Sequence, residues 1–183
     1  MLKSVTPKEF WEIFNKKLSR KREDLGTQFL SAYREDTTWT NDVLKLLSDI
    51  GSENGYVDSK SCAKEYMLID MGYFDFNAYC DWDFDVAIEH ENDGTKWLEE
   101  FIKLIHVNCG LKVIITYGQE SETKGFILTE KAKEIYNKRV YKNPHDNWLF
   151  IFGPTKKELK NGKWFKAYTL EMVDAKIEKF IEI

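Results

Sequence analysis

The sequence predicts an α/β fold in which a mixed central β-sheet is flanked by helices. Segments with apolar residues at helical spacing alternate along the chain with short runs rich in β-branched and aromatic residues. With 43% hydrophobic and 15% aromatic residues, the 183-residue chain can build a core of its own. We therefore expect a single domain over residues 1–183, with a helical part at about 7–50, a sheet-forming core at about 56–152, and a hairpin and helix at about 155–183.

Two helices are expected in the N-terminal part. Thr6 is a favoured N-cap, Pro7 suits the first helical position, and Glu9 completes a capping box. The apolar residues that follow recur at helical spacing: Phe10, Ile13, Phe14 and Leu18. The second helix follows Trp39 and ends near Gly51, with an inward face of Val43, Leu44 and Leu47.

Alternating side chains predict two strands in the middle of the chain, at about 65–76 and 82–91. One side of the second strand carries Trp82, Phe84, Val86, Ile88 and His90, and the other carries Asp83, Asp85, Ala87, Glu89 and Glu91. This pattern assigns His90 to the packed side, away from the carboxylates. A helix over 96–106 and a buried strand over 111–117 are expected next.

The C-terminal third predicts a helix over 129–138 and a strand over 148–152. Asn161-Gly162 is a favoured hairpin pair, so we expect a β-turn there and a strand over 163–171. A final helix completes the predicted order.

The charge is unevenly distributed along the chain. The net charge is −4, yet residues 65–100 carry eleven Asp and Glu against one Lys, a local charge of −10. Residues 139–167 carry seven basic residues against two acids, with Trp164 and Phe165 among the lysines. A basic segment with interleaved aromatics can bind nucleic acid, and a solvated hairpin face is the alternative interpretation.

Several other classes of protein are not indicated. The three cysteines are widely spaced and form neither a disulfide framework nor a zinc pattern. No apolar run approaches the roughly 20 residues that cross a bilayer, and the N-terminus lacks the apolar core of a signal peptide. We therefore expect no membrane partner and a cytoplasmic location.

The two strands of the acidic segment bring carboxylates together. If they form a simple hairpin centred near residues 79–80, Asp70 pairs with Glu89. Opposed residues point to the same face with Cβ atoms roughly 5 Å apart, so the two carboxylates would repel each other. Glu91 lies two residues further along the same face. A hard divalent cation such as Mg²⁺, which prefers oxygen ligands, would compensate for the repulsion, and a solvated sheet face is the alternative.

These residues resemble the PD-(D/E)xK superfamily, the restriction-endonuclease-like nucleases. In that family an Asp near the end of one strand faces a (D/E)-x-K on the next; Asp70 and Glu89 match the acids, and Glu91 stands in the lysine position. The following helix and strand also match the family's order of elements. The resemblance covers roughly residues 39–118 and marks the region of about 56–152 as a nuclease-like core.

The resemblance implies an Mg²⁺- or Mn²⁺-dependent endonuclease that acts on nucleic acid, DNA rather than RNA. Asp70, Glu89 and the backbone carbonyl of His90 would bind the metal, and Glu91 would orient or deprotonate the attacking water. Lys103 or Lys96, on the neighbouring helix, would replace the missing motif lysine. Because many such nucleases pair up to cut both strands, a homodimer is a further expectation.

Two alternatives from other classes stay open. One is a restriction-endonuclease-like domain without catalytic activity that binds nucleic acid or protein and no metal. The other is an α/β domain whose acidic face binds a basic protein partner in a salt-sensitive way.

Overall fold

The computed structural model describes residues 5–33, 35–55, 57–58, 69–74, 84–118, 122–139 and 147–183. Its helices are α1 (Pro7–Leu25), α2 (Gln28–Ala32), α3 (Asp36–Glu53), α4 (Trp97–Ile105), α5 (Glu122–Asn137) and α6 (Lys156–Lys160). Its strands are β1 (Val57–Asp58), β2 (Met71–Phe74), β3 (Phe84–Glu91), β4 (Cys109–Tyr117), β5 (Trp148–Gly153), β6 (Lys166–Val173) and β7 (Lys176–Glu182). The predicted α/β class is confirmed.

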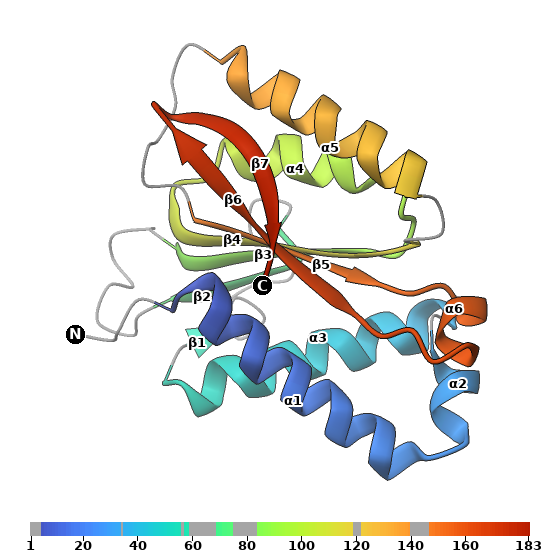
Figure 1. Ribbon diagram of the computed structural model, residues 1–183. Helices are drawn as coiled ribbons and strands as arrows, with labels where there is room; N and C mark the ends of the chain where they lie inside the picture. The colour runs from blue at the N-terminus through green and yellow to red at the C-terminus, as the bar shows by residue number, and fades with distance from the viewer. Residues whose placement is uncertain are drawn as a thin grey trace.

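The described strands form one mixed sheet between two helical layers. Neighbours in the sheet follow chain order from β1 to β7. Helices α4 and α5 lie over one face, and α1 and α3 lie over the other (Figure 1). Strands β3, β4 and β5 are parallel, whereas β2 and β6 run antiparallel to their neighbours. The carboxyl ends of β3, β4 and β5 therefore share one edge of the sheet, where β2 begins.

Strand alternation divides the interior into two cores. In β4, Val113 and Ile115 join the core beneath α1 and α3, whereas Ile114 joins the core beneath α4 and α5. The first core also takes Phe10, Phe14 and Leu18 of α1 and Val43 and Leu47 of α3. This agrees with the inward faces predicted for the two N-terminal helices.

The start of α1 follows the predicted capping box. Glu9 N donates to Thr6 Oγ1 at 3.2 Å, and Thr6 N donates to Glu9 Oε2 at 3.0 Å. Pro7 has no backbone N–H, so three amides are left unpaired at the start of α1, and two of them thus find acceptors.

Three predicted elements differ in extent. Of the strand expected at 65–76, residues 65–68 and 75–76 lie outside the described residues, and β2 begins only at Met71, with Ile69 and Asp70 preceding it. Residues 82 and 83 of the next predicted strand also lie outside them. Helix α5 begins at Glu122, two turns before the predicted start, and the short helix α2 was not predicted.

The predicted β-turn at Asn161-Gly162 is wrong. Asn161 is instead the C-cap of α6, and the φ of 83° at Gly162 lies in the left-handed region common just after a helix. Helix α6 forms because Thr155 and Glu158 make a second capping box: Glu158 N donates to Thr155 Oγ1 at 3.2 Å, and Thr155 N donates to Glu158 Oε2 at 2.9 Å.

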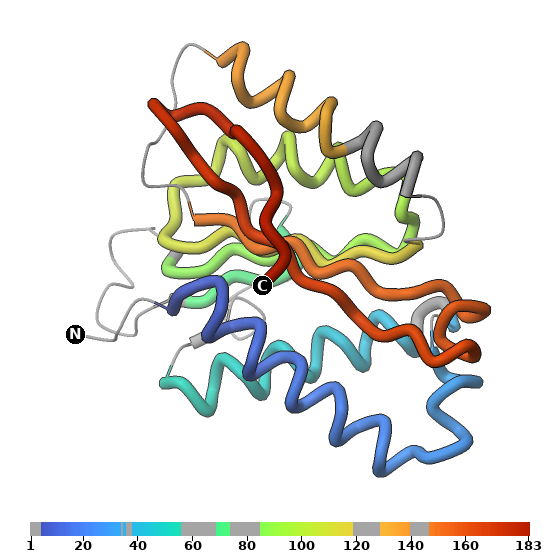
Figure 2. The backbone as a smooth tube through the Cα atoms, in the orientation of Figure 1, coloured from blue at the N-terminus to red at the C-terminus, as the bar shows by residue number. Residues whose placement is uncertain are grey.

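The predicted C-terminal helix is also wrong, because that segment is strand β7. Strands β6 and β7 pair on both sides of Asp174 and Ala175, whose φ values of 49° and 56° are the positive pair that a two-residue hairpin turn requires. Asn137 at the end of α5 holds β7 through hydrogen bonds to the backbone of Ile177, at 2.8 Å and 3.0 Å. Figure 2 shows the hairpin extending from the sheet toward the end of α5.

Candidate active site

The predicted pairing of β2 with β3 is confirmed. Met71 pairs with Ile88 and Gly72 pairs with Ala87, so the next position along the ladder sets Asp70 against Glu89. Asp70 itself lies one residue before β2. Its carboxylate makes the next hydrogen bond to β3 after those between the strand backbones: His90 N donates to Asp70 Oδ2 at 2.8 Å. The side chain of Asp70 thus replaces a backbone carbonyl as the acceptor, which fixes the carboxylate beside β3.

Glu89 is the most deeply buried of the predicted site residues. Its side chain is 1% exposed and lies on the face of the sheet that α4 covers. Burial, followed by the charges of Asp70 and Glu100, raises the pKa of Glu89 to about 9, although the hydrogen bond with Lys103 opposes the shift. Burial also raises the pKa of Asp70, against the lowering effect of the His90 amide. The pair therefore favours holding a proton.

Helix α4 supplies the cation of the site. Four residues at helical spacing face the core: Trp97, Phe101, Leu104 and Ile105. Glu100 and Lys103, three residues apart on the flank of this helix, reach the carboxylates of the sheet. Lys103 Nζ lies 2.8 Å from Glu89 Oε1 and 2.5 Å from Glu100 Oε2. Burial lowers the pKa of Lys103, but the hydrogen bonds with Glu100 and Glu89 outweigh it and the net shift is upward.

The approach of α4 to the sheet depends on Gly94. A Cβ atom at this position would lie 1.7 Å from the backbone oxygen of Tyr117 in β4, far inside van der Waals contact. Only glycine fits there without displacing the segment between β3 and α4. The distance between Lys103 and Glu89 thus depends on this contact.

Glu91 lies on the predicted face of β3 but bonds to the turn that follows. Its Oε1 accepts a hydrogen bond from Asp93 N at 2.7 Å, and the residue is partly exposed. The role predicted for Glu91 in orienting water stays a prediction. The same holds for the backbone carbonyl of His90 as a metal ligand.

The His90 side chain points to the opposite face of the sheet, as its place in the strand predicted. His90 Nε2 lies 2.8 Å from Tyr117 Oη, which also accepts a hydrogen bond from Trp39 Nε1 at 2.7 Å. Burial lowers the pKa of His90 to about 4, so the imidazole is neutral at pH 7. His90 is therefore packed in the core on this face and is not part of the carboxylate cluster.

Of the two lysines expected to replace the motif lysine, the structure brings Lys103 to the acids. Lys96 occupies the exposed N-cap position of α4. The participation of Glu100 follows from its spacing to Lys103, a signal visible in the sequence. The His90 amide that holds Asp70 carries no sequence signal, because every non-proline residue has such a donor.

The donor set is compatible with a hard cation. Asp70 just before β2 and Glu89 on β3 offer carboxylate oxygens, and Mg²⁺ is commonly held by one or two carboxylates together with waters and phosphate. Among the described residues, no group of three or more His, Cys, Asp and Glu side chains is arranged to hold a metal. A bound ion would therefore depend on two carboxylates, and it would replace the proton of Glu89 and the ammonium of Lys103.

Within the described part of the chain, no helix has the length and apolar composition required to cross a bilayer. Comparison of the chain with protein-family models, with curated proteins and with solved structures gives no match.

Proposed function

We propose that the protein is a metal-dependent nuclease that hydrolyses phosphodiester bonds in nucleic acid, DNA rather than RNA. The observation that carries this proposal is the cluster in which Asp70, one residue before β2, lies opposite Glu89 of β3, with Lys103 Nζ 2.8 Å from Glu89 Oε1. An Asp beside one strand, a Glu on the next, and a helix and parallel strand after it are features that the resemblance to restriction-endonuclease-like nucleases implies. Membership of that family is part of the proposal.

In this proposal Asp70 and Glu89, with the His90 carbonyl, hold Mg²⁺ or Mn²⁺. Such an ion, when bound, lowers the pKa of a coordinated water and neutralises charge on the phosphodiester. Lys103 then turns from Glu89 to a phosphate oxygen, since its flexible stem and three donors suit that contact. Glu91, on the same face of β3, accepts the proton of the attacking water after releasing the amide of Asp93.

The test is cleavage of single- and double-stranded DNA and RNA with Mg²⁺ or Mn²⁺. We expect the purified protein to cleave DNA, and Asp70→Asn to reduce cleavage at least about a hundredfold. Helix α5 offers a matched control for Lys103. Lys133 and Glu130 form an ion pair at 3.2 Å and are three residues apart in the sequence, as Lys103 and Glu100 are. Lys103→Met should therefore lose cleavage, whereas Lys133→Met should retain it.

A second candidate function is a nucleic-acid- or protein-binding domain without catalysis. The observation that favours it is the position of Lys103, whose ammonium already neutralises part of the acidic cluster. Calorimetric titration with Mn²⁺ separates the two. Heat of binding that disappears in Asp70→Asn supports the nuclease, whereas the absence of heat together with no cleavage of any substrate supports the binding domain.

A further inference from the structure

Basic side chains gather at the same edge of the sheet as the carboxylates. Helix α6 follows directly from β5, and the carboxyl ends of β3 and β5 lie at one edge because these strands run parallel through β4. Two strand spacings separate β3 from β5, roughly 10 Å. Glu89 points to the face of the sheet that α4 covers, whereas Leu159 packs α6 against the core on the other face. A ligand that contacts both Glu89 and α6 therefore has to pass around this edge of the sheet.

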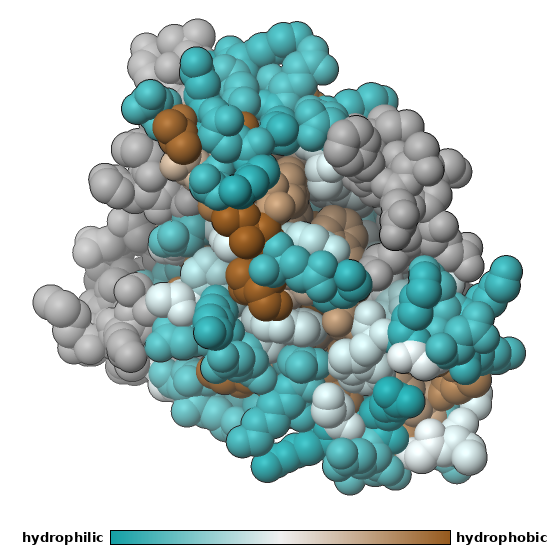
Figure 3. Space-filling view, viewed as in Figure 1, coloured by the Kyte–Doolittle hydropathy of each residue, from teal (hydrophilic) through white to brown (hydrophobic). Residues whose placement is uncertain are grey.

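Three lysines of α6 are available for an external ligand. Lys156, Lys157 and Lys160 are exposed, while Glu158 and Leu159 form the buried side of the helix. None of the three lysines takes part in an ion pair with another described residue. Figure 3 shows hydrophilic side chains over this end of the molecule.

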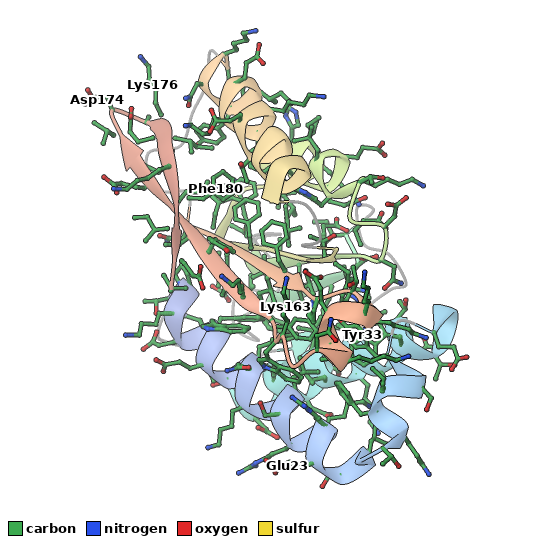
Figure 4. All side chains as sticks on the ribbon, turned by 45° about the vertical axis from the view of Figure 1, so that its right-hand side comes forward. Glu23, Tyr33, Lys163, Asp174, Lys176 and Phe180 are labelled. Atoms are coloured by element: carbon green, nitrogen blue, oxygen red, sulfur yellow. The ribbon has the colours of Figure 1, made fainter. Side chains whose placement is uncertain are left out.

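Neighbouring basic residues have structural partners and are not part of this surface. Lys163, labelled in Figure 4, pairs with Glu158 at 2.8 Å. On α1, Lys17 pairs with Glu53 and Lys21 pairs with Asp42, both on α3. These three lysines hold elements of the fold together, which leaves the exposed face of α6 with unbalanced positive charge.

Arg22 extends the positive surface onto α1. Its guanidinium lies 4.9 Å from the centre of the Trp164 ring, and Trp164 Nε1 donates to Asn15 Oδ1 at 2.8 Å. Trp164 thereby joins the end of α1 to the segment after α6. We define the α6 surface as Lys156, Lys157, Lys160 and Arg22.

The aromatic residues of this region are not free to stack on bases. Phe165 is 5% exposed and belongs to the core, and Trp164 packs against Phe29 and Phe165 with Arg22 over its ring. The sequence suggested aromatics interleaved with lysines, but in the structure Phe165 is buried, and the partly buried Trp164 has Arg22 over its ring. Such a surface contacts phosphates and does not distinguish one base from another.

We propose that the α6 surface binds the phosphate backbone of a nucleic acid strand that leads to the Asp70–Glu89 site. This inference rests on the proposed function for the identity of the ligand, but binding can be measured without cleavage. Charge complementarity selects the ligand: three unpaired lysines and an arginine match a row of phosphates. The surface therefore contributes affinity without sequence preference.

The experiment measures binding of fluorescent single- and double-stranded DNA to the Asp70→Asn protein in EDTA, over a series of salt concentrations. The variant combines Lys156→Gln, Lys157→Gln and Lys160→Gln. Each lost phosphate contact lowers the slope of log affinity against log salt by about 0.7–0.9, so the triple variant should lose about 2 to 3 in slope and at least about tenfold in affinity near 0.1 M salt. The loss should be equal for unrelated sequences.

The matched control replaces three exposed lysines elsewhere: Lys131→Gln on α5, Lys138→Gln just after α5, and Lys176→Gln at the start of β7. Figure 4 shows Lys176 far from Lys163 and α6. The control changes the net charge equally and should keep the wild-type slope. Thermal unfolding of both variants checks that they fold.

Equal affinity of the α6 variant and wild type would overturn the proposal, as would an equal loss in the control. Binding to anionic vesicles but to no nucleic acid would overturn it in favour of a lipid surface. If DNA binds through α6 but is never cleaved by the wild-type protein, the surface stands and the nuclease proposal fails. If the wild-type protein cleaves DNA and the α6 variant keeps the wild-type KM, the nuclease proposal stands and the proposal for the α6 surface fails.

Discussion

Two buried glutamates of this protein, each paired with a lysine, have opposite electrostatic surroundings. Glu158 in α6 accepts hydrogen bonds from Thr155 N, Thr155 Oγ1 and Lys163 Nζ at 2.8–3.1 Å. Burial acts to raise its pKa, but the hydrogen bonds with Lys163 and Thr155 prevail and the pKa of Glu158 is lowered. In contrast, the pKa of Glu89 rises to about 9.

The pKa values of the two glutamates differ because different numbers of hydrogen-bond donors and of other carboxylates surround them. Donors surround Glu158, so its charge stabilises the fold. Glu89 shares the ammonium of Lys103 with Glu100 and has Asp70 as a further acidic neighbour. An excess of carboxylates over cations in a buried place costs stability, and such groups are characteristic of functional sites. The comparison agrees with a structural role for Glu158 and with the role proposed for Glu89.

The largest difference between variants of Glu89 and Glu158 is expected in the rate of DNA cleavage. We expect Glu89→Gln to lower the rate of DNA cleavage at least about a hundredfold, because the amide removes a charged metal ligand. Glu158→Gln should stay within about twofold of wild type in the same assay, since its charge contacts only the start of α6 and Lys163. Comparable losses in the two variants would end the functional distinction.

Metal binding should depend on pH through Glu89. An ion must displace the proton that Glu89 holds below a pKa of about 9, so Mn²⁺ affinity should rise up to about tenfold per pH unit between pH 6 and 8. Calorimetry in two buffers of different ionisation enthalpy would count the released protons. A constant affinity over this range would contradict the raised pKa of the site.

Stability should change with pH in opposite directions for the two glutamates. The raised pKa of folded Glu89 stabilises the protein most below its unfolded value of 4.5, and this contribution is lost as the pH rises toward about 9. Glu89→Gln should therefore gain at least about 1 kcal/mol of unfolding free energy relative to wild type between pH 5 and pH 9. Urea unfolding at both pH values measures the change.

The lowered pKa of Glu158 gives the opposite sign: its stabilisation is present above 4.5 and is lost as the pH falls through its folded value. Glu158→Gln should cost about 1 kcal/mol at pH 7, where the carboxylate is charged, and less in acid. A variant less stable than wild type by the same amount at pH 7 and at pH 3 would show that the charge does not matter.

The smallest effect on the cleavage rate is expected on the opposite face of the sheet. Tyr117→Phe removes the hydroxyl shared by His90 and Trp39 and should cost about 1–2 kcal/mol in unfolding free energy, because it leaves buried polar groups unpaired. The cleavage rate of the folded variant should stay unchanged, since His90 faces away from the carboxylates. A rate loss comparable to that of Glu89→Gln would show that the two faces are coupled.

The site was predictable where strand pairing is local. Strands β2 and β3 are consecutive in the chain, and Asp70 and Glu89 are equally far in sequence from residues 79–80, so the register followed from residue numbers. The i,i+3 spacing of Glu100 and Lys103 set both on one flank of α4. The contact of Glu91 with Asp93 N was not predictable, because the sequence does not show whether a strand-end carboxylate turns to the site or to its own loop.

The two C-terminal errors have different causes. Asn161-Gly162 resembles a hairpin turn, but the capping box of Thr155 and Glu158 creates a helix just before it. Ile177, Phe180 and Ile181 have a spacing that suits a helix, yet pairing with β6 and contact with α5 select a strand. A neighbouring local motif overrode the turn pattern at the first place, and tertiary contacts overrode the helical pattern at the second.

Gly94 carries no chemistry, yet it sets how near α4 comes to the sheet. Any larger residue would push the connecting loop outward and take Lys103 and Glu100 of α4 with it, while Asp70 and Glu89 kept their places. One added methyl group at this position would thus be enough to abolish the proposed activity, and an inspection of the charged residues alone would not reveal the loss.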